Sequence, residues 1–381
     1  MPLLTTTADV AAFCQTLPKS GFITVDTEFM RDRTYWSQLC LIQVGGPGQA
    51  KAIDPLAKGL NLEPLWEVLQ NPNLTKVFHA ARQDIEIFVQ LGGFIPAPIL
   101  DTQVMAMVCG FGEQASYESL VQKILGQSLD KSQRFTDWGR RPLNPEQVQY
   151  ALDDVIHLRP IYEHLQKQLE ERKREEWVAE EMDILRDPAA YETDPEKSWE
   201  RLRPRTTNPK FLGVLQTIAA WREREAQRRN IPRGRLLKDD MVLELAARPP
   251  QSMEDFGKLR RLPPLDQENK QSLLSALQDA KKLPPAKLAL PPLKPPLNAR
   301  QSAMLELLRV LLRLKCEQHD VAAKLVANSE DLENFARGEK DNLPFLHGWR
   351  YQIFGEDAEK LAAGKLALGL NGKGLALINA A

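Results

Sequence analysis

The sequence has few of the features that mark secreted, membrane or zinc-binding proteins. Its four cysteines occur without a C-x-x-C pair, so neither a zinc site nor a disulfide framework is indicated, and a reducing compartment fits. No apolar run approaches the roughly 18 residues that a membrane helix needs. The N-terminus lacks a basic segment followed by an apolar one, so a signal peptide is not indicated. We therefore expect a cytoplasmic protein with no membrane partner.

A glycine-rich phosphate loop and a large net charge are also missing. None of the predicted strands runs into such a loop, which argues against a nucleotide-binding fold of the Rossmann or P-loop type. The formal net charge is −1, so any surface for nucleic acid must be local. The composition, 43% hydrophobic and 27% charged, is that of a globular protein, and 381 residues predict two or three domains.

The most informative stretch is 22–29, where β-prone, mostly apolar residues lead into Asp26-Thr27-Glu28. Alternate side chains of a strand share a face, so Asp26 and Glu28 project together from the end of this strand. Two adjacent carboxylates raise each other's pKa unless a cation lies between them, and carboxylate oxygens suit Mg²⁺ or Mn²⁺. A bare D-x-E is more often an acidic turn that ends an ordinary strand, so the rest of the chain has to decide.

An α/β layer with a mixed sheet is predicted for the N-terminal half, because short apolar runs and helical spacings alternate along it. The predicted strands are 22–29, 39–46, 50–54 and 76–79, and the predicted helices lie within 1–20, at 62–69 and at 85–91. Asp84 falls where a strand passes into a helix. Its simplest role is that of a capping or first-turn acid, which the helix dipole favours.

A long helix is predicted from Asn144, with Pro145 in its first turn. Its apolar stripe consists of Val148, Ala151, Leu152, Val155, Leu158 and Tyr162. Tyr150 and Asp154 are four residues apart, so they lie one above the other on a different face. A surface tyrosine beside a surface aspartate is the alternative interpretation, since such pairs are common on helices.

Asp26-x-Glu28, Asp84 and Tyr150-x-x-x-Asp154 together resemble the three exonuclease motifs of the DEDD superfamily. The tyrosine ahead of the last aspartate is similar to the DEDDy branch, and no histidine occurs at 148–153. The intervening sequence resembles the ribonuclease D family in Thr34-Tyr35, Leu39-Cys40-Leu41-Ile42-Gln43, His79 to Asp84, Asp137-Trp138-Gly139-Arg140-Arg141-Pro142-Leu143 and Gln147-x-x-Tyr150-Ala151. The resemblance spans roughly residues 21–160 and implies a ribonuclease H-like exonuclease domain.

The resemblance implies a 3′–5′ exoribonuclease that releases nucleoside 5′-monophosphates from RNA with a free 3′ end, tRNA precursors in particular. It also implies two divalent cations, Mg²⁺ or Mn²⁺, about 4 Å apart. By the family pattern, Asp26, Glu28 and Asp154 hold one cation. Asp26 also contacts the second, which Asp84 helps to place. Tyr150 would orient the attacking water, because an unperturbed tyrosine pKa near 10 makes a poor base at pH 7.

The C-terminal half is predicted to be helical. Residues 206–282 are similar to the helicase-and-RNase-D C-terminal (HRDC) domain, a small helical bundle that contacts nucleic acid in related proteins. This range has fifteen Lys/Arg against ten Asp/Glu. Its basic cluster consists of Arg228, Arg229, Arg233, Arg235 and Lys238. We expect RNA phosphate contacts there, although a solvated helix face is an equally good explanation.

Residues 298–381 resemble a second, more divergent HRDC-type domain, with eleven residues of each charge. We expect the exonuclease domain at 1–185, a linker at 186–205 and an extended spacer at 283–297, which contains six prolines. The predicted fold is thus an α/β exonuclease domain with a mixed sheet flanked by helices, followed by two all-α domains.

Three alternatives remain open. The carboxylates do not distinguish RNA from DNA, so a 3′–5′ DNA exonuclease on the same scaffold is one of them. A non-catalytic RNA-binding scaffold is the second, although a binding module has no need of four buried carboxylates. An interaction protein of a helicase complex is the third, and it would show no metal-dependent turnover.

Overall fold

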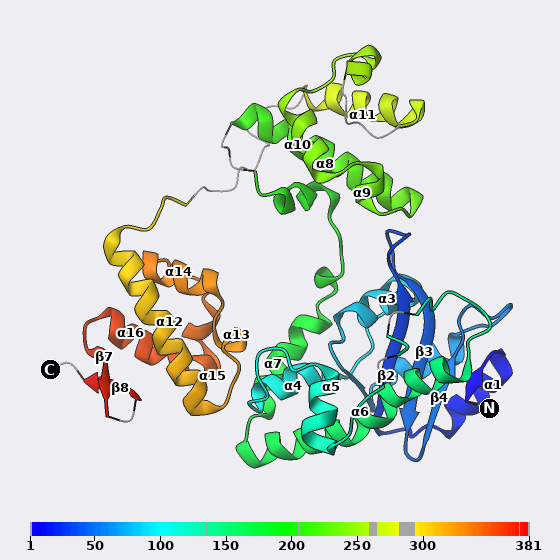
Figure 1. The fold of residues 1–381 in the computed structure, drawn as a ribbon, viewed down its shortest axis with the longest axis horizontal. Helices are drawn as coiled ribbons and strands as arrows, with labels where there is room; N and C mark the ends of the chain where they lie inside the picture. The colour runs from blue at the N-terminus through cyan, green and yellow to red at the C-terminus, as the bar shows by residue number, and fades with distance from the viewer. Residues whose placement is uncertain are drawn as a thin grey trace.

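The described part of the chain forms three bodies that follow one another in sequence (Figure 1). The structure is a computed structural model and describes residues 2–130, 132–134, 136–204, 206, 208–258, 265–281, 294–372 and 374–379. Residues 283–293 of the expected proline-rich spacer therefore lie outside the described residues. The remaining end of that spacer is held against the third body, where Lys294 pairs with Glu339 at 2.8 Å.

A six-stranded mixed sheet forms the centre of the first body. Its strands are β1 Leu3–Leu4, β2 Gly21–Met30, β3 Gln38–Gly46, β4 Gln49–Ile53, β5 Leu74–Phe78 and β6 Ile99–Asp101, in the spatial order β1-β4-β3-β2-β5-β6. β3 is antiparallel to both neighbours, whereas the other pairs are parallel. The predicted mixed sheet is confirmed. The sequence does not indicate β1 or β6, because strands of two and three residues carry too little pattern.

Helices cover both faces of this sheet. One face packs against α1 Thr7–Thr16, α2 Glu63–Leu69 and α3 Arg82–Gly92. The other face is covered by α6 Pro145–Arg172, whose apolar stripe contacts Leu41 and Ala52. The body is completed by α4 Thr102–Val108, α5 Tyr117–Leu120, the π-helix η1 Val121–Leu125 and α7 Glu175–Arg186. The long helix predicted from Asn144 is therefore confirmed as α6.

Local features hold α6 close to the sheet. The side chain of Asn144 accepts a hydrogen bond from the N–H of Gln147 at 2.7 Å, and the Gln147 side chain accepts from the N–H of Asn144 at 2.9 Å. On β2, Thr24 donates its hydroxyl to the carbonyl of Val155 at 2.7 Å. At Gly45 of β3, a Cβ atom would lie 2.3 Å from Thr24 Oγ1. A larger residue there would push the helix away from the sheet.

The second body is a helical bundle. Its elements are the 3-10 helix η3 Pro195–Leu202, α8 Pro209–Arg229, α9 Arg233–Leu236, α10 Asp239–Ala247, the 3-10 helix η4 Met253–Lys258 and α11 Gln267–Ala280. Trp199 of η3 is buried in the same core as Leu215 and Leu245. The bundle thus begins before residue 206, where the sequence predicts its start.

Residues 186–205, expected to be a linker, contain two short helices, η3 and the 3-10 helix η2 Pro188–Ala190. The Asp-Pro pairs that predict a chain break here start these helices instead. Asp187 accepts a hydrogen bond from the N–H of Ala189, and Asp194 accepts one from Glu196. Proline suits the first helical position, since its missing N–H would have no partner there.

The third body contains α12 Ala299–His319, α13 Ala323–Val326, α14 Ser329–Arg337, the 3-10 helix η6 Pro344–Leu346, α15 Gly348–Arg350, the π-helix η7 Tyr351–Gly355 and α16 Glu356–Ala362. A hairpin of β7 Leu366–Asn371 and β8 Gly374–Asn379 follows. The prediction of an all-α third domain therefore does not hold for its last residues. The physical reason is Gly372, which directly follows β7 between two leucine-containing runs, because glycine at the first position of a short loop favours a hairpin.

The second and third bodies share an arrangement of helices that repeats after 90 residues. α8 and α12 both have 21 residues, α9 and α13 have four, and α10 and α14 have nine. Each helix begins 90 positions after its counterpart, the first pair at 209 and 299. Asn230 and Asp320 end the first helix of each set in the left-handed conformation, with φ of 49° and 48°. The two bodies therefore contain the same three-helix unit.

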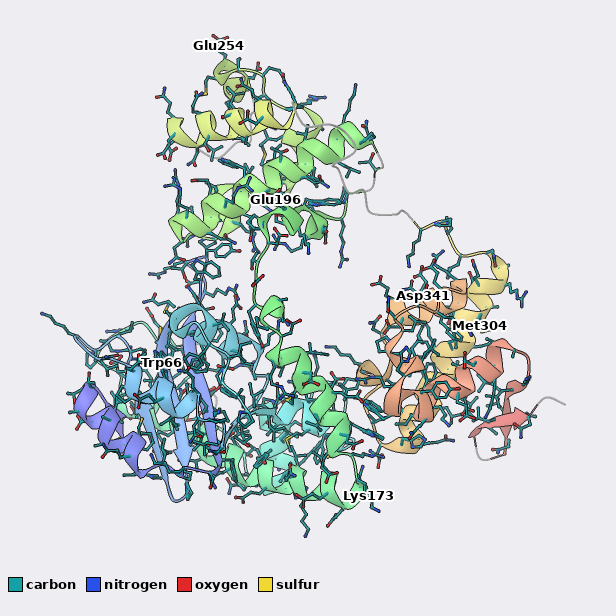
Figure 2. All side chains as sticks on the ribbon, turned by 180° about the vertical axis from the view of Figure 1, so that it is seen from behind. Trp66, Lys173, Glu196, Glu254, Met304 and Asp341 are labelled. Atoms are coloured by element: carbon teal, nitrogen blue, oxygen red, sulfur yellow. The ribbon has the colours of Figure 1, made fainter. Side chains whose placement is uncertain are left out.

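The third body packs on the first through one continuous apolar core. This core joins Met107 and Leu165 of the first body to Leu308 and Phe345 of the third. Figure 2 shows the two bodies side by side from behind, with Lys173 marking the turn between α6 and α7 and Met304 marking α12. Burial of apolar surface is the main favourable term in such contacts, so the first and third bodies form one packed unit.

Aromatic and charged contacts add to this core. The rings of Trp177 on α7 and Trp349 on α15 stack with centroids 4.3 Å apart and an interplanar angle of 8°. Arg350 donates to Glu180 at 2.6 Å and also to Glu181. Its Nε donates to the carbonyl of Leu325 at 2.7 Å. Because Arg350 is only 11% exposed and Glu181 14%, the contact between these two is shielded from water.

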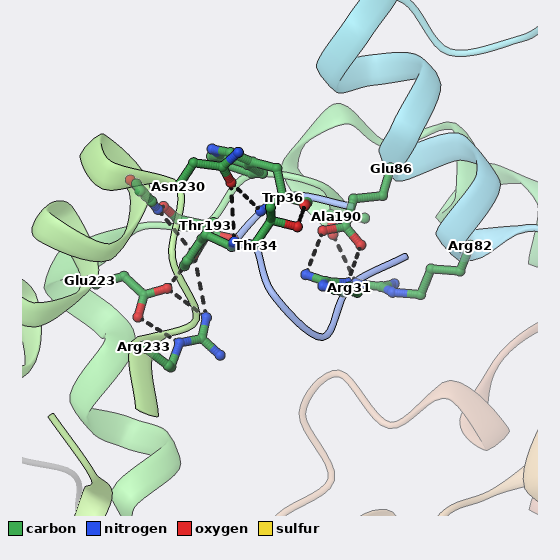
Figure 3. Close-up of polar contacts among 12 residues, drawn as sticks. Arg31, Thr34, Trp36, Arg82, Glu86, Ala190, Thr193, Glu223, Asn230 and Arg233 are labelled. Carbon is green, nitrogen blue, oxygen red and sulfur yellow. Dashed lines mark hydrogen bonds and ion pairs between the residues drawn. The ribbon is translucent and has the colours of Figure 1, made fainter. Parts of the chain in front are cut away.

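The second body contacts the first through polar groups (Figure 3). The loop between β2 and β3 meets the end of α8 and the start of α9. Asn230 accepts hydrogen bonds from the N–H groups of Tyr35 and Trp36, at 3.1 and 3.0 Å. Tyr35 donates its hydroxyl to Glu223, which Arg233 also binds at 2.6 and 3.0 Å. We call Tyr35, Glu223, Asn230 and Arg233 the interdomain latch.

The structure also describes the state of the cysteines and the length and polarity of the helices. All four cysteines are buried free thiols in the structure. Among the described helices, none is both long and apolar enough to cross a membrane.

Candidate metal centre

β2 and α6 bring three carboxylates together. Asp26 and Glu28 alternate with Val25 and Thr27, so they share the face of β2 that α6 covers. Asp154 lies on α6 beside Val155, the residue that Thr24 ties to the sheet. As a result, carboxylate oxygens of Asp26, Glu28 and Asp154 lie within 4.8 Å of one another.

Asp84 reaches this group from the first turn of α3. It is buried and accepts a hydrogen bond from the hydroxyl of Thr27, the residue between the two acids of β2. Burial, and after it the charge of Asp26, raises the pKa of Asp84. The charge of Asp84 in turn raises the pKa of Glu28. We therefore treat the four carboxyls as one electrostatic group, the acidic cluster: Asp26, Glu28, Asp84 and Asp154.

Burial and mutual repulsion disfavour the ionised forms of the cluster. Burial and then the charges of Asp26, Asp154 and Asp84 raise the pKa of Glu28 to about 9. Burial, followed by the charge of Asp153, raises the pKa of Asp154 to about 7. For Asp26, burial and the charge of Asp154 raise the pKa well above its usual range. Among the residues that the structure describes, no positive side chain offsets these shifts.

A divalent cation fits this donor set. Carboxylate oxygen is the ligand that Mg²⁺ and Mn²⁺ prefer, and a cation would remove the repulsion that raises the pKa values. Asp26, Glu28 and Asp154 are close enough to share one ion. Asp84 is held at the side of the group by Thr27 and offers its carboxylate separately.

A cleft of about 250 Å³ opens beside the cluster. It is lined by Asp26, His79, Ser116, Tyr117, Glu118, Leu129, Asp130, Arg134, Tyr150, Asp154 and Leu158. Tyr150 stands one helical turn before Asp154, and its ring packs on that of Trp138 with centroids 6.2 Å apart. Burial and the charges of Asp154, Glu28 and Asp26 raise the pKa of Tyr150 above its usual range. Its hydroxyl therefore stays protonated at neutral pH and can donate a hydrogen bond.

Three further cleft residues have no assigned role in the sequence-based prediction. Tyr117 donates its hydroxyl to the carbonyls of Asp153 and Asp154, at 3.1 and 2.5 Å, and so fixes the helix turn that carries Asp154. His79 packs on Tyr117 with ring centroids 5.5 Å apart. Arg134 is the basic residue that lines the cleft in the described part of the chain. Tyr117 and Arg134 lie outside the motifs and have no local signal in the sequence, whereas His79 stands within the segment that leads to Asp84.

The five basic residues expected to bind RNA do not form one open patch. Arg228 and Arg229 both pair with Glu225, at 2.6 and 3.0 Å. Arg229 also pairs with Asp266 at 2.9 Å. Arg233 belongs to the interdomain latch, and Arg235 donates to the carbonyl of Asp32 in the first body at 3.4 Å. Lys238 is exposed at the start of α10.

Comparison of the sequence with protein families gives two matches. Residues 2–170 match the family described as 3'-5' exonuclease, and residues 211–268 match the HRDC domain. Proteins named ribonuclease D from Granulibacter bethesdensis and Gluconacetobacter diazotrophicus are 50% and 47% identical to this chain. These alignments cover 99% and 97% of this chain and 96% and 95% of the relatives.

Solved structures resemble the chain over a similar extent. The crystal structure of Escherichia coli RNase D, described as an exoribonuclease involved in structured RNA processing, is 29% identical with a TM-score of 0.78. It covers 95% of this chain, and 98% of the solved chain is matched. The catalytic core of RRP6 from Trypanosoma brucei is 25% identical with a TM-score of 0.57, over 74% of this chain and 79% of its own.

Proposed function

Because this chain belongs to the ribonuclease D family and is a 3′–5′ exoribonuclease, we propose that it hydrolyses RNA in the cleft beside the acidic cluster, with two divalent cations, Mg²⁺ or Mn²⁺. The observation that carries this proposal is the approach of Asp26, Glu28 and Asp154 to within 4.8 Å in a partly buried setting that raises their pKa values. Partly buried carboxylates this close are unfavourable without a cation, so their arrangement is best explained by cation binding.

The cations, when bound, supply a hydroxide-like water for in-line attack and stabilise the departing 3′ oxygen. We assign the remaining work to side chains of the chain. Asp26 interacts electrostatically with Glu28, Asp84 and Asp154 and would contact both ions, while Glu28 and Asp154 would complete one site and Asp84 would contribute to the other. Tyr150 would donate a hydrogen bond that orients the attacking water, since its raised pKa makes it unsuitable as a base.

We further propose that the substrates are structured RNAs with a single-stranded 3′ end, tRNA precursors among them. A cleft of about 250 Å³ can admit the end of an unpaired strand but not a folded RNA. The helical bodies would hold the folded part and thereby raise the effective concentration of the 3′ end at the cleft. The involvement of the Escherichia coli relative in structured RNA processing supports this proposal.

The second and third bodies are proposed to be two HRDC-type domains. The match at 211–268 supports the first, and the helix set that repeats after 90 residues supports the second. We retain the proposed ranges 206–282 and 298–381 and add η3 to the first, because Trp199 is part of its core. The linker then shortens to the residues between α7 and η3.

Lys238 and Arg228 are the members of the basic cluster that we propose for direct phosphate contact, because both are exposed and, unlike the exposed Arg235, neither donates to the first body. Arg228 would have to exchange its pairing with Glu225 for an RNA phosphate. Arg233 and Arg235 would act on RNA binding indirectly, through the position of the second body, and Arg229 through the packing within that body.

The test is a product analysis on matched oligonucleotides. Wild-type protein, Asp26→Asn and Tyr150→Phe are incubated with 5′-labelled RNA and with DNA of equal sequence, in Mn²⁺ and then in chelator. We expect stepwise shortening of RNA from the 3′ end, release of nucleoside 5′-monophosphates and loss of activity in chelator. Asp26→Asn should lower kcat by roughly a thousand-fold or more, and Tyr150→Phe by about a hundred-fold.

Near wild-type rates for Asp26→Asn would contradict the proposed site. Equal rates on RNA and DNA would show that the cleft does not select ribose.

A further inference from the structure

Gln43 lies directly across the sheet from Asp26. β2 and β3 are antiparallel, and Asp26 is the register partner of Gln43, as Glu28 is of Leu41. Residues that face each other in an antiparallel pair have side chains on the same face, with Cβ atoms about 4.5–5.5 Å apart. Gln43 therefore stands beside the candidate metal centre, on the face that α6 covers.

The surroundings of Gln43 are otherwise apolar or already hydrogen-bonded. Its neighbour on β4 is Ala52, which belongs to the cluster formed with Leu41 and the apolar stripe of α6. Thr24, the next residue of β2 on this face, donates its hydroxyl to Val155. Asp26 is thus the polar side chain of β2 that lies closest to Gln43 in the register.

The amide of Gln43 is fully buried, and neither Nε2 nor Oε1 has a hydrogen-bond partner among the described residues. Buried polar side chains are paired in the large majority of cases, and each exception calls for a physical explanation. A glutamine that only filled space at this position would make the fold less stable than a methionine of similar length, because methionine has no amide group that needs hydrogen-bond partners.

We propose that Gln43 is a positioning residue for Asp26, donating a hydrogen bond from Nε2 to the Asp26 carboxylate, directly or through one water, when a divalent cation is bound. Ligating carboxylates are normally hydrogen-bonded by such outer residues, which fix their orientation. The three side-chain torsions of glutamine allow its amide to turn towards Asp26 without movement of β3. The inference rests on the proposed metal site.

The test compares Gln43→Met with Leu41→Met as the matched control. Leu41 is also fully buried on the same face of β3 and stands opposite Glu28 as Gln43 stands opposite Asp26. The two changes therefore make similar alterations in packing, and only the first removes an amide. Two quantities are measured on the full chain: the thermal midpoint without metal, and the Mn²⁺ dissociation constant by isothermal titration calorimetry.

We expect Gln43→Met to unfold at the wild-type temperature or above it in the absence of metal, because a buried unpaired amide is lost. Its Mn²⁺ affinity should fall by about 10- to 100-fold, the usual effect of removing an outer hydrogen-bond partner. Leu41→Met should bind Mn²⁺ as the wild type does. A purely structural role for Gln43 would not predict unchanged or raised stability of the metal-free variant together with weaker Mn²⁺ binding.

The inference is overturned if Gln43→Met binds Mn²⁺ with wild-type affinity. It is also overturned if the metal-free variant is strongly destabilised or unfolded, because the amide would then have a structural partner. If wild-type protein and Leu41→Met themselves fail to bind Mn²⁺, the proposed metal site fails, and that result is distinct from failure of the role of Gln43 alone.

Discussion

At the scale of single residues, protonation of the acidic cluster stabilises the folded protein, whereas cation binding requires the same carboxyls to lose their protons. Glu28 and Asp154 have pKa values of about 9 and about 7 in the folded protein, against roughly 4 for exposed carboxyls. Between about pH 4 and pH 9, the folded state therefore binds more protons than the unfolded state. The stability that this provides is present below about pH 4 and is lost as pH rises towards 9.

Glu28→Gln should remove much of this pH dependence, because the amide cannot ionise. In chelator, we expect the difference in unfolding free energy between Glu28→Gln and wild type to grow in favour of the variant from pH 5 to pH 8.5. Mn²⁺ should stabilise the wild type increasingly over the same range, since the cation competes with protons. Urea unfolding at several pH values measures both effects. A difference that does not vary with pH would contradict the raised pKa of Glu28.

Several site residues could be predicted because their signals are local. The two-residue period of a strand places Asp26 and Glu28 on one face, and the helical spacing places Tyr150 above Asp154. Tyr117 could not be found in this way. It contacts the carbonyls of Asp153 and Asp154 from a distant part of the chain, and nothing in the residues around it indicates that contact.

At the scale of elements, the loop after β2 connects the metal centre to the helical bundle. Glu223 is fully buried and accepts hydrogen bonds from Tyr35 and Arg233. Burial would raise the pKa of Glu223, but these hydrogen bonds and the charges of Arg233 and Arg201 outweigh it and keep the pKa low. Glu223 is therefore ionised, and each donor that it loses leaves a buried charge less well satisfied.

Tyr35→Phe should weaken the interdomain latch by about 1.5–3 kcal/mol, the usual worth of a hydrogen bond to a charged group. We expect KM for a tRNA precursor with a 3′ tail to rise about tenfold, because the second body is held less firmly. Cleavage of short unstructured RNA should not change. Tyr351→Phe, in the third body, is the matched control and should leave both substrates unaffected. An equal loss on both substrates would show that Tyr35 acts on the cleft itself.

Element type was easier to predict than element contacts. The helices of the second body have clear apolar periodicity. Its contact with the first body, however, involves Asn230. Neither the left-handed conformation of Asn230 nor its hydrogen bonds from backbone N–H groups leave a periodic signal in the sequence. The prediction that Arg233 and Arg235 bind RNA has the same limit. Their charge is visible in the sequence, whereas their partners, Glu223 and the carbonyl of Asp32, are not.

At the scale of the whole molecule, the first and third bodies share one apolar core, while the second is attached by polar contacts. The sequence predicts three bodies but not this packing, because the surfaces of α6 and α7 that meet the third body look like ordinary apolar helix faces. A chain that ends near residue 205 would expose part of this core. We therefore expect it to be less stable than the full chain and prone to aggregate.

Trp349→Ala tests the shared core. Trp349 is 6% exposed and stacks on Trp177 of the first body, so its truncation should destabilise the chain by about 3–5 kcal/mol. Leu307→Ala is the control: Leu307 lies on α12 but is 41% exposed, and its loss should cost about 0.5 kcal/mol or less. Urea unfolding followed by circular dichroism gives both values. Equal stabilities for the two variants would mean that the third body is not packed on the first.

The central claim is that the acidic cluster holds two catalytic cations, and the most direct test is a count of bound Mn²⁺. Electron paramagnetic resonance can measure the Mn²⁺ bound per chain in the presence of adenosine 5′-monophosphate. We predict two ions for the wild type, one for Asp84→Asn and none bound tightly for Asp26→Asn, which contributes to both sites. The same number of tightly bound ions in wild type and Asp26→Asn would contradict the claim.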